Sequence, residues 1–153
     1  MAFVDQDNSG DRFVNVTHRV GKSGDWDDLL TVQLMLEFVY TNDNRLKKSK
    51  PIKGPITVTG RPARDTSILI AHYQKIVLKR AKPQGFIDRA VGKNKEKSTI
   101  WALDSHMNLL LAALRSSDTA ITYLKKKAPL LASSLITVQE GLERDFPMVI
   151  ATP

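Results

Sequence analysis

The fold is decided by a stretch that opens with Thr59-Gly60-Arg61-Pro62-Ala63-Arg64-Asp65-Thr66, continues through Pro83-Gln84-Gly85-Phe86-Ile87-Asp88, and closes with Ser98-Thr99-Ile100-Trp101-Ala102-Leu103. Each half consists of a glycine turn, a hydroxyl residue and an apolar-periodic segment. Glycine adopts a positive φ at no steric cost, which a tight loop before a helix often needs. Thr66 and Thr99 stand where a hydroxyl accepts backbone N–H groups at a helix start. Read alone this is ordinary helix capping, but the pattern occurs twice.

Hydrophobic residues at helical spacing predict helices around these turns. The first begins after Asp25, its cap, and ends near residues 41–44, and the second runs from Thr66 to Arg80. The third begins at Ser98 or Thr99 and reaches Arg115; it is the most apolar, so we expect it at the centre. A short fourth helix is capped by Asp118 and ends before Pro129. The expected core positions are Leu29, Val32, Leu36, Val39, Tyr40, Leu69, Ile70, Tyr73, Ile76, Val77, Ile100, Leu103, Met107, Leu110, Leu111, Leu114, Ile121 and Leu124.

The remaining segments predict loops and a few short strands. Residues 1–11 are polar and expected to be loose, whereas residues 12–20 alternate valines with polar residues, as a half-buried strand does. Residues 45–55 and 90–97 are expected to be basic loops, the second one mobile, with a brief extended piece at residues 56–58. Residues 135–138 and 148–151 look like strands, so a small sheet would combine both ends of the chain.

Length and composition limit the class of protein. The 153 residues amount to about one domain, and 42% hydrophobic residues are enough to form a core. There is no cysteine, which excludes disulfides and thiolate metal sites. The N-terminus carries acids where a signal peptide needs a basic start and an apolar run, and no apolar stretch is long enough to span a bilayer. We therefore expect a soluble protein, cytoplasmic unless another route exports it to a periplasm or a cell wall.

The positive charge is concentrated in the middle of the chain. Residues 45–97 hold fifteen Lys and Arg residues against three Asp and Glu residues, whereas residues 1–44 hold three against eight. A basic segment of this kind favours a polyanionic partner such as nucleic acid, a phosphate-rich wall polymer or acidic lipid. A lysine-rich solvated surface explains the same charge without any partner.

The order of these residues resembles the peptidoglycan-binding domain family, a three-helix module attached to wall hydrolases. The family pattern places Val-Gln on the first helix, an Asp-Gly-x-Phe-Gly-x-x-Thr turn, a helix ending in an aromatic-Gln pair, and a second Asp-Gly turn before the last helix. The matching residues here are Val32-Gln33, Leu36, Gly60, Thr66, Ile70, Tyr73-Gln74, Pro83-Gln84-Gly85, Thr99, Trp101 and Leu103. The resemblance implies a mainly α fold, with a three-helix core at residues 20–104 of a single domain, residues 1–153. Residues 105–153 would add a C-terminal helix, with a small β element from the termini.

The two turns depart from the family pattern. Thr59 and Gln84 replace the two aspartates, Pro62 replaces the phenylalanine, and Ala63 replaces the second glycine. Because these residues would shape a ligand pocket, the resemblance carries the fold further than the binding. It implies a non-catalytic binding module that recognises bacterial peptidoglycan or another wall polymer and uses no cofactor. The ligand-binding residues would be Gly60, Arg61, Arg64, Tyr73, Gln84, Gly85 and Trp101, with Tyr73 and Trp101 structural in the alternative interpretation.

Catalysis and metal binding find little support in the residues. Asp104-Ser105-His106 supplies the residue types of a triad, but neighbours on a helix point in different directions. The basic segment lacks an obvious pair of converging carboxylates for glycosidase chemistry. His18, His72 and His106 show no metal-binding spacing, so we expect no metal site.

Two other functions remain as alternatives. The same fold would serve as a protein–protein adaptor if the altered turns had lost sugar binding, with the basic face meeting an acidic partner. A nucleic-acid-binding protein would instead use the cations along the second helix, with Tyr73 or Trp101 for stacking. The cations concerned are Arg61, Arg64, Lys75, Lys79, Arg80 and Lys82.

Overall fold

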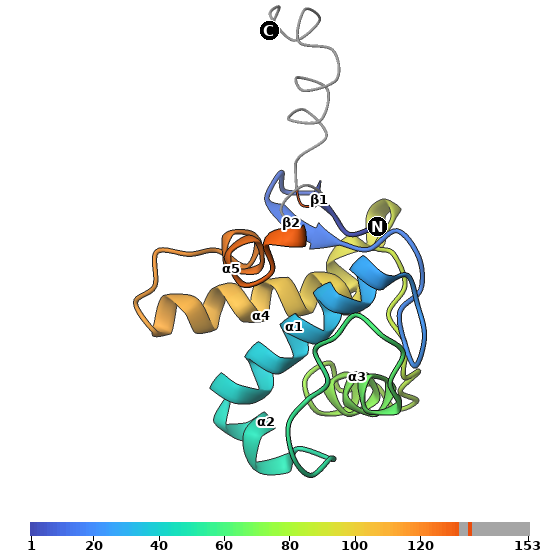
Figure 1. Ribbon diagram of the computed structural model, residues 1–153. Helices are drawn as coiled ribbons and strands as arrows, with labels where there is room; N and C mark the ends of the chain where they lie inside the picture. The colour runs from blue at the N-terminus through green and yellow to red at the C-terminus, as the bar shows by residue number, and fades with distance from the viewer. Residues whose placement is uncertain (132–134, 136–153) are drawn as a thin grey trace, which may run out of the picture.

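The computed structural model of the protein describes residues 1–131 and residue 135. This part of the chain is mainly helical, with one small antiparallel sheet (Figure 1). The elements are β1 (Phe3–Gln6), β2 (Arg12–Asn15), α1 (Trp26–Asn42), α2 (Asn44–Ser49), α3 (Arg64–Ile76), the 3-10 helix η1 (Gly92–Lys97), α4 (Thr99–Ala113), α5 (Ala120–Lys127) and the 3-10 helix η2 (Pro129–Leu131). None of the described helices has the length and apolarity needed to cross a bilayer.

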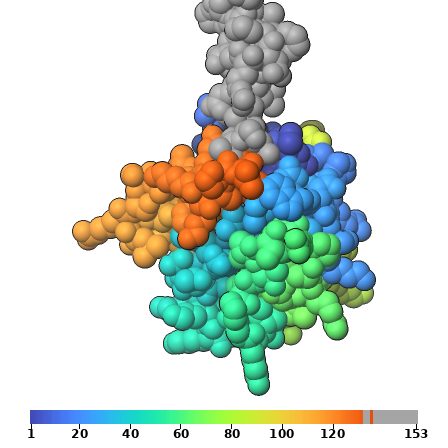
Figure 2. Space-filling view, viewed as in Figure 1, coloured from blue at the N-terminus to red at the C-terminus, as the bar shows by residue number. Residues whose placement is uncertain are grey.

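The central helix is α1. The higher apolar content of α4 had predicted α4 at the centre instead. Eleven of the 17 residues of α1 are buried, and the helix contacts α2, α3, α4 and α5. In Figure 1, α1 crosses the middle of the molecule between α3 and the pair formed by α4 and α5. By contrast, α4 leaves Leu109 exposed at 71% and Leu114 at 58%. The connection from α4 to α5 protrudes from the body in the space-filling view (Figure 2).

The helix positions agree with the hydrophobic periodicity, whereas the ends are set by other residues. The hydroxyl of Ser98 accepts the backbone N–H of Trp101 and caps α4. The cap of α5 is Thr119, which forms a capping box with Thr122, and not Asp118 as predicted. Asp25 stands at the start of α1, but its side chain forms no capping hydrogen bond.

The second predicted helix starts earlier and ends earlier than expected. α3 begins at Arg64, two residues before Thr66, and ends at Ile76 rather than near Arg80. The chain leaves the helix because Lys79 takes a positive φ of 57° and the N–H of Arg80 bonds back to the carbonyl of Gln74. The helix therefore ends well before Pro83.

The N-terminal residues form a hairpin rather than a loose segment. β1 pairs antiparallel with β2, with Val4 opposite Val14, and the predicted strand of residues 12–20 ends at Asn15. It ends there because the Asn15 side chain bonds both backbone groups of Ala90, which draws the chain out of the sheet. Of the two strands predicted at residues 135–138 and 148–151, all residues except Leu135 lie outside the described part of the chain.

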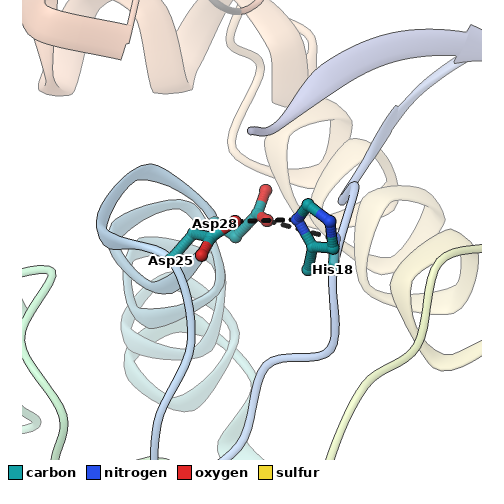
Figure 3. Close-up of side chains that lie close together, drawn as sticks. All are labelled: His18, Asp25 and Asp28. Carbon is teal, nitrogen blue, oxygen red and sulfur yellow. Dashed lines mark hydrogen bonds and ion pairs between the residues drawn. The ribbon is translucent and has the colours of Figure 1, made fainter.

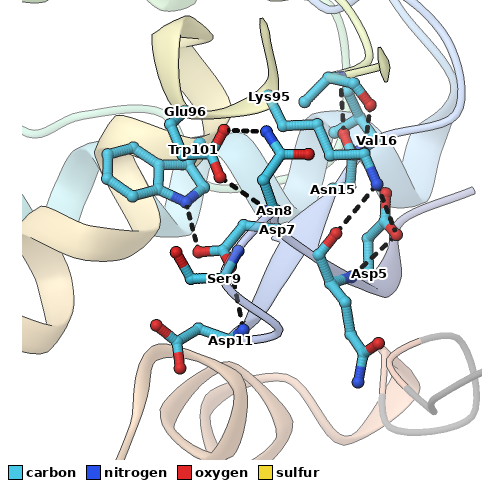
Figure 4. Close-up of polar contacts among 12 residues, drawn as sticks. Asp5, Asp7, Asn8, Ser9, Asp11, Asn15, Val16, Lys95, Glu96 and Trp101 are labelled. Atoms are coloured by element: carbon cyan, nitrogen blue, oxygen red, sulfur yellow. Dashed lines mark hydrogen bonds and ion pairs between the residues drawn. The ribbon is translucent and has the colours of Figure 1, made fainter. Parts of the chain in front are cut away.

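Two predicted basic loops contain helices. Asp43 accepts the N–H groups of Arg45 and Leu46 and so caps α2, whose residues 45–49 belong to the first predicted loop, residues 45–55. Residues 92–97 form η1, which the hairpin turn holds in place: the Asn8 N–H donates to Glu96 at 2.7 Å, and Lys95 lies 3.3 Å from Asp5 (Figure 4). Residues 56–58 form no strand.

Candidate functional site

A buried glutamine holds the first glycine turn against α1. The side-chain oxygen of Gln33 accepts the N–H groups of Thr59 at 3.0 Å and Gly60 at 2.8 Å. Its amide nitrogen donates to the carbonyl of Arg61 at 3.0 Å and to the hydroxyl of Thr66 at 3.2 Å. The Gln33 side chain that makes all four bonds has no exposed surface. We call this arrangement the first glutamine clasp.

The second glycine turn is held in the same way by α3. The side-chain oxygen of Gln74 accepts the N–H groups of Gln84 at 2.7 Å and Gly85 at 3.2 Å. Its amide nitrogen donates to the carbonyl of Phe86 at 2.9 Å and to the hydroxyl of Thr99 at 3.1 Å. The two glycines have nearly identical φ angles, +73° for Gly60 and +74° for Gly85. The chain therefore contains a structural repeat, built twice from glutamine, glycine and threonine.

The two threonines act differently from the sequence prediction. Thr66 and Thr99 are both buried, and each hydroxyl accepts the amide of a clasp glutamine instead of a backbone N–H. Ala63 is the N-cap residue of α3 and provides no side-chain cap, and α4 is capped by Ser98. The threonines therefore connect each turn to the preceding glutamine helix.

The two repeats differ at the position seven residues before the glutamine. In the first repeat this residue is Trp26, and a Cβ added to Gly60 would lie 2.6 Å from the indole. In the second it is Ser67, and a Cβ added to Gly85 would lie 2.8 Å from the serine hydroxyl. The large indole covers the first turn, whereas the small serine lies beside a cavity of about 430 Å³ at the second.

This cavity, which we call the clasp cavity, lies between the second turn and the segment that precedes α1. Its lining residues are Arg19, Gly21, Lys22, Ser23, Ser67, Gln84, Gly85 and Phe86. Val20 and Ile87 fix the two walls by a pair of backbone hydrogen bonds of 2.9 and 2.7 Å. The Ser67 hydroxyl donates to the carbonyl of Gly85 at 2.8 Å, which holds α3 against the turn.

The electrostatics of the clasp cavity are positive. Arg19 donates to both carboxylate oxygens of Asp88, at 2.8 and 3.2 Å, and its guanidinium lies 3.8 Å from the centre of the Phe86 ring. The hydrogen bond to Asp88 raises the pKa of Arg19, so the side chain stays charged. Lys22 is exposed and forms no ion pair with the described residues. Cations together with hydroxyl and amide groups suit a ligand that carries a carboxylate and other polar groups.

The structure divides the predicted ligand-binding residues among different places. Gln84 and Gly85 line the clasp cavity, whereas Gly60 is buried against Trp26. Arg61 belongs to the first turn, and Arg64 is the first residue of α3. Tyr73 has no exposed surface, and its hydroxyl bonds His106 at 3.0 Å, so it is a core residue. Trp101 lines a separate cavity.

Arg19, Lys22 and Ser67 line the clasp cavity but were not among the ligand-binding residues predicted from the sequence. The usable signal was the interval of seven residues that separates Trp26 from Gln33 and Ser67 from Gln74. This interval equals about two helical turns, so both residues share a helix face with the glutamine.

The histidines lie in three different environments. His72 accepts or donates a bond to Tyr40 at 2.6 Å, and burial lowers the pKa of His72. Nε2 of His106 lies 2.8 Å from a carboxylate oxygen of Asp43, whereas Asp104 accepts the N–H of Val14. The sequence Asp104-Ser105-His106 therefore does not form a catalytic triad. The structure thus separates the groups that a triad or a three-histidine site would need to bring together.

One mixed cluster lies at the start of α1. The ligand-type atoms of His18, Asp25 and Asp28 lie within 4.8 Å of one another (Figure 3). The buried Asp28 already accepts the N–H of His18 at 3.2 Å and the amino group of Met1 at 3.1 Å, and burial raises the pKa of Asp28. The cluster therefore serves to join the first residues to α1.

Comparison with known proteins adds no assignment. No family model, no curated protein and no solved structure matches the chain.

Proposed function

We propose that the protein is a non-catalytic binding module that recognises bacterial peptidoglycan through the clasp cavity. The observation that supports this proposal is the repeated glutamine clasp. Six of the residues that carry the resemblance to peptidoglycan-binding domains form the two clasps: Gln33, Gly60, Thr66, Gln74, Gly85 and Thr99. Their order in the sequence therefore corresponds to one shared structural role.

The chemistry of the clasp cavity is compatible with a wall fragment. Peptidoglycan stem peptides carry carboxylates, and Arg19 and Lys22 supply positive charge at the cavity. The exposed amide of Gln84 and the hydroxyls of Ser23 and Ser67 supply hydrogen-bonding groups for amides and sugar hydroxyls. The first turn has no comparable role in this proposal, because Trp26 covers Gly60.

Retention on purified wall sacculi at low and high salt tests this proposal. We expect the protein to remain bound at high salt, and Gln84→Ala and Lys22→Ala to weaken retention about tenfold each, as the loss of a charge-assisted or buried polar contact does. The matched controls are Gln6→Ala and Lys53→Ala, whose exposed side chains lie outside the cavity, and Arg61→Ala at the first turn.

The outcomes separate the three candidate functions. Retention lost by salt alone, equally in all variants, would refute specific wall recognition and indicate nonspecific charge. Tight DNA binding with a steep salt dependence would favour the nucleic-acid alternative. The structure gives that alternative no stacking residue at Tyr73, which is buried. Failure to bind sacculi combined with capture by an acidic protein would favour the adaptor.

A further inference from the structure

A second cavity lies away from both glutamine clasps. It has a volume of about 960 Å³ and is formed by the β1–β2 hairpin, α4 and α5. None of its lining residues belongs to the clasp cavity. Its size is at the upper end of the range of ~300–1,000 Å³ that is typical of ligand sites. We call it the hairpin cavity.

The polar groups around the hairpin cavity are held in fixed positions. The indole N–H of Trp101 donates to Asp7 at 3.1 Å, and the other oxygen of Asp7 accepts the N–H groups of Ser9 and Asp11, both at 2.9 Å (Figure 4). On the opposite wall, Asn108 donates to Asp104 at 3.0 Å and accepts the N–H of Ala120 at 2.7 Å. The hairpin, α4 and α5 are thus connected by side-chain bonds at the cavity wall.

Several acceptors in this cavity have unused capacity. Each carboxylate oxygen of Asp104 accepts one hydrogen bond, from Val14 or from Asn108, although a carboxylate accepts about four. The exposed carboxylate of Asp11 forms no hydrogen bond or ion pair with the described residues. The hydroxyl of Ser105 likewise bonds no described group. The cavity therefore offers acceptors to a ligand that supplies donors.

Charge and geometry narrow the class of ligand. Two carboxylates (Asp7 and Asp11) balance two cations (Arg12 and Lys125), and burial raises the pKa of Asp104 to about 7, so the lining has no excess of positive charge that would favour an anion. The three carboxylates do not bring their oxygens within 4.8 Å of one another, so this part of the chain has no preformed cage for a metal ion here. Trp101, Leu109 and Ile121 add apolar surface between the acceptors. Alternating apolar faces and hydroxyl donors are the chemistry of a sugar.

We propose that the hairpin cavity binds a neutral saccharide, whose hydroxyls donate to Asp11 while its C–H face packs on Trp101. This site is separate from the clasp cavity, and the inference does not depend on peptidoglycan binding there. Its lining comes from the hairpin, α4 and α5, most of which lie outside the resemblance to peptidoglycan-binding domains.

An NMR titration of the full chain with chitotriose, maltotriose, spermine and inorganic phosphate tests the proposal. We expect at least one of the two sugars to shift the indole N–H signal of Trp101 and the amide signals of Val14 and Ala120. Trp26 is the only other tryptophan, so the Trp26→Phe variant assigns the indole signal. Spermine and phosphate should leave these signals unchanged.

The matched variants are Asp11→Asn and Asp25→Asn, which remove the same charge from an exposed aspartate inside and outside the cavity. Asp11→Asn should weaken sugar binding about tenfold, because a neutral acceptor replaces a charged one, and Asp25→Asn should have no effect. The absence of any shift with both sugars, a response to spermine or phosphate in their place, or equal weakening by both variants would overturn the proposal. The sacculus assay with Lys22→Ala probes only the clasp cavity, so the two proposals can fail separately.

Discussion

The glutamine clasps predict an unusual pH dependence for the substitution Gln33→Glu. The change keeps the side-chain shape and the acceptor for Thr59 and Gly60, but it replaces the amide donor by an oxygen. When ionised, that oxygen faces the carbonyl of Arg61, which was 3.0 Å from the amide nitrogen. When protonated, the new carboxyl donates to the same carbonyl and restores the bond. The variant should therefore resemble the wild type only while this carboxyl is protonated.

The magnitude follows from the burial of the site. Gln33 has no exposed surface, and burial raises the pKa of a carboxyl by up to about 3–5 units, an effect that the two N–H donors of the turn partly offset. A net rise of roughly 2 units corresponds to about 3 kcal/mol of unfolding free energy. Because the folded-state pKa is the higher one, the variant keeps its stability below about pH 4 and loses it as the pH rises to about 7.

Urea denaturation between pH 4 and 8, with the wild-type curve subtracted at each pH, measures this effect. Gln74→Glu should behave in the same way, because Gln74 makes the same four bonds and is equally buried. The control is Gln6→Glu at an exposed position, which should change stability by less than ~0.5 kcal/mol. A flat difference curve for Gln33→Glu, whether near zero or uniformly destabilised, would refute the donor role assigned to the amide.

Three further predictions concern the turns and the cavities. Gly60→Ala should lower the free energy of unfolding by roughly 3 kcal/mol, because it adds a clash with Trp26 at 2.6 Å to the strain of a positive φ. Gly10 also has a positive φ but nothing within 4 Å of an added Cβ, so Gly10→Ala should cost only ~1 kcal/mol. Urea denaturation measures both. Burial raises the pKa of Asp104 from 3.8 to about 7, so this group should make the protein more stable as the pH falls from about 8 to 5. Asp104→Asn should reduce this dependence of the unfolding free energy on pH. An unchanged dependence would contradict the raised pKa of Asp104. Ser67→Trp should place in the second repeat the side chain that covers Gly60 in the first, fill the clasp cavity and abolish sacculus retention; a folded variant with normal retention would contradict the proposed site.

The helices were predictable because their apolar residues recur at helical spacing along a short window of sequence. The hairpin and η1 were not, because long-range bonds help to hold them: Asn8 bonds Glu96 and Lys93, more than 80 residues away. The central place of α1 was missed for a related reason. Asp28 and Gln33 are buried polar residues of α1, and only their tertiary partners explain why a less apolar helix lies inside.

The candidate site shows the same limit. The glycine turns, Gln33 and Gln74 stand out in the sequence, and the structure joins them in the two clasps. A threonine at a helix start, however, has a local interpretation as a cap, and nothing local indicates that its hydroxyl bonds a glutamine on the preceding helix. Arg61 and Arg64 stood out because they are charged and close to a glycine in the sequence. Arg19 and Lys22 reach the second turn through the Val20–Ile87 bridge, which spans 67 positions of the chain.

The repeat also explains why the proposed site lies at the second turn and not at the first. Both turns have a glycine at positive φ and a buried glutamine, so the backbone conformation is specified equally in each. What differs is the side chain seven residues before the glutamine, which can change without breaking any of the four clasp bonds. A tryptophan there contributes apolar contacts over the first turn, and a serine leaves room beside the second. A fold with two equivalent turns can thus use one for stability and leave the other available to a ligand.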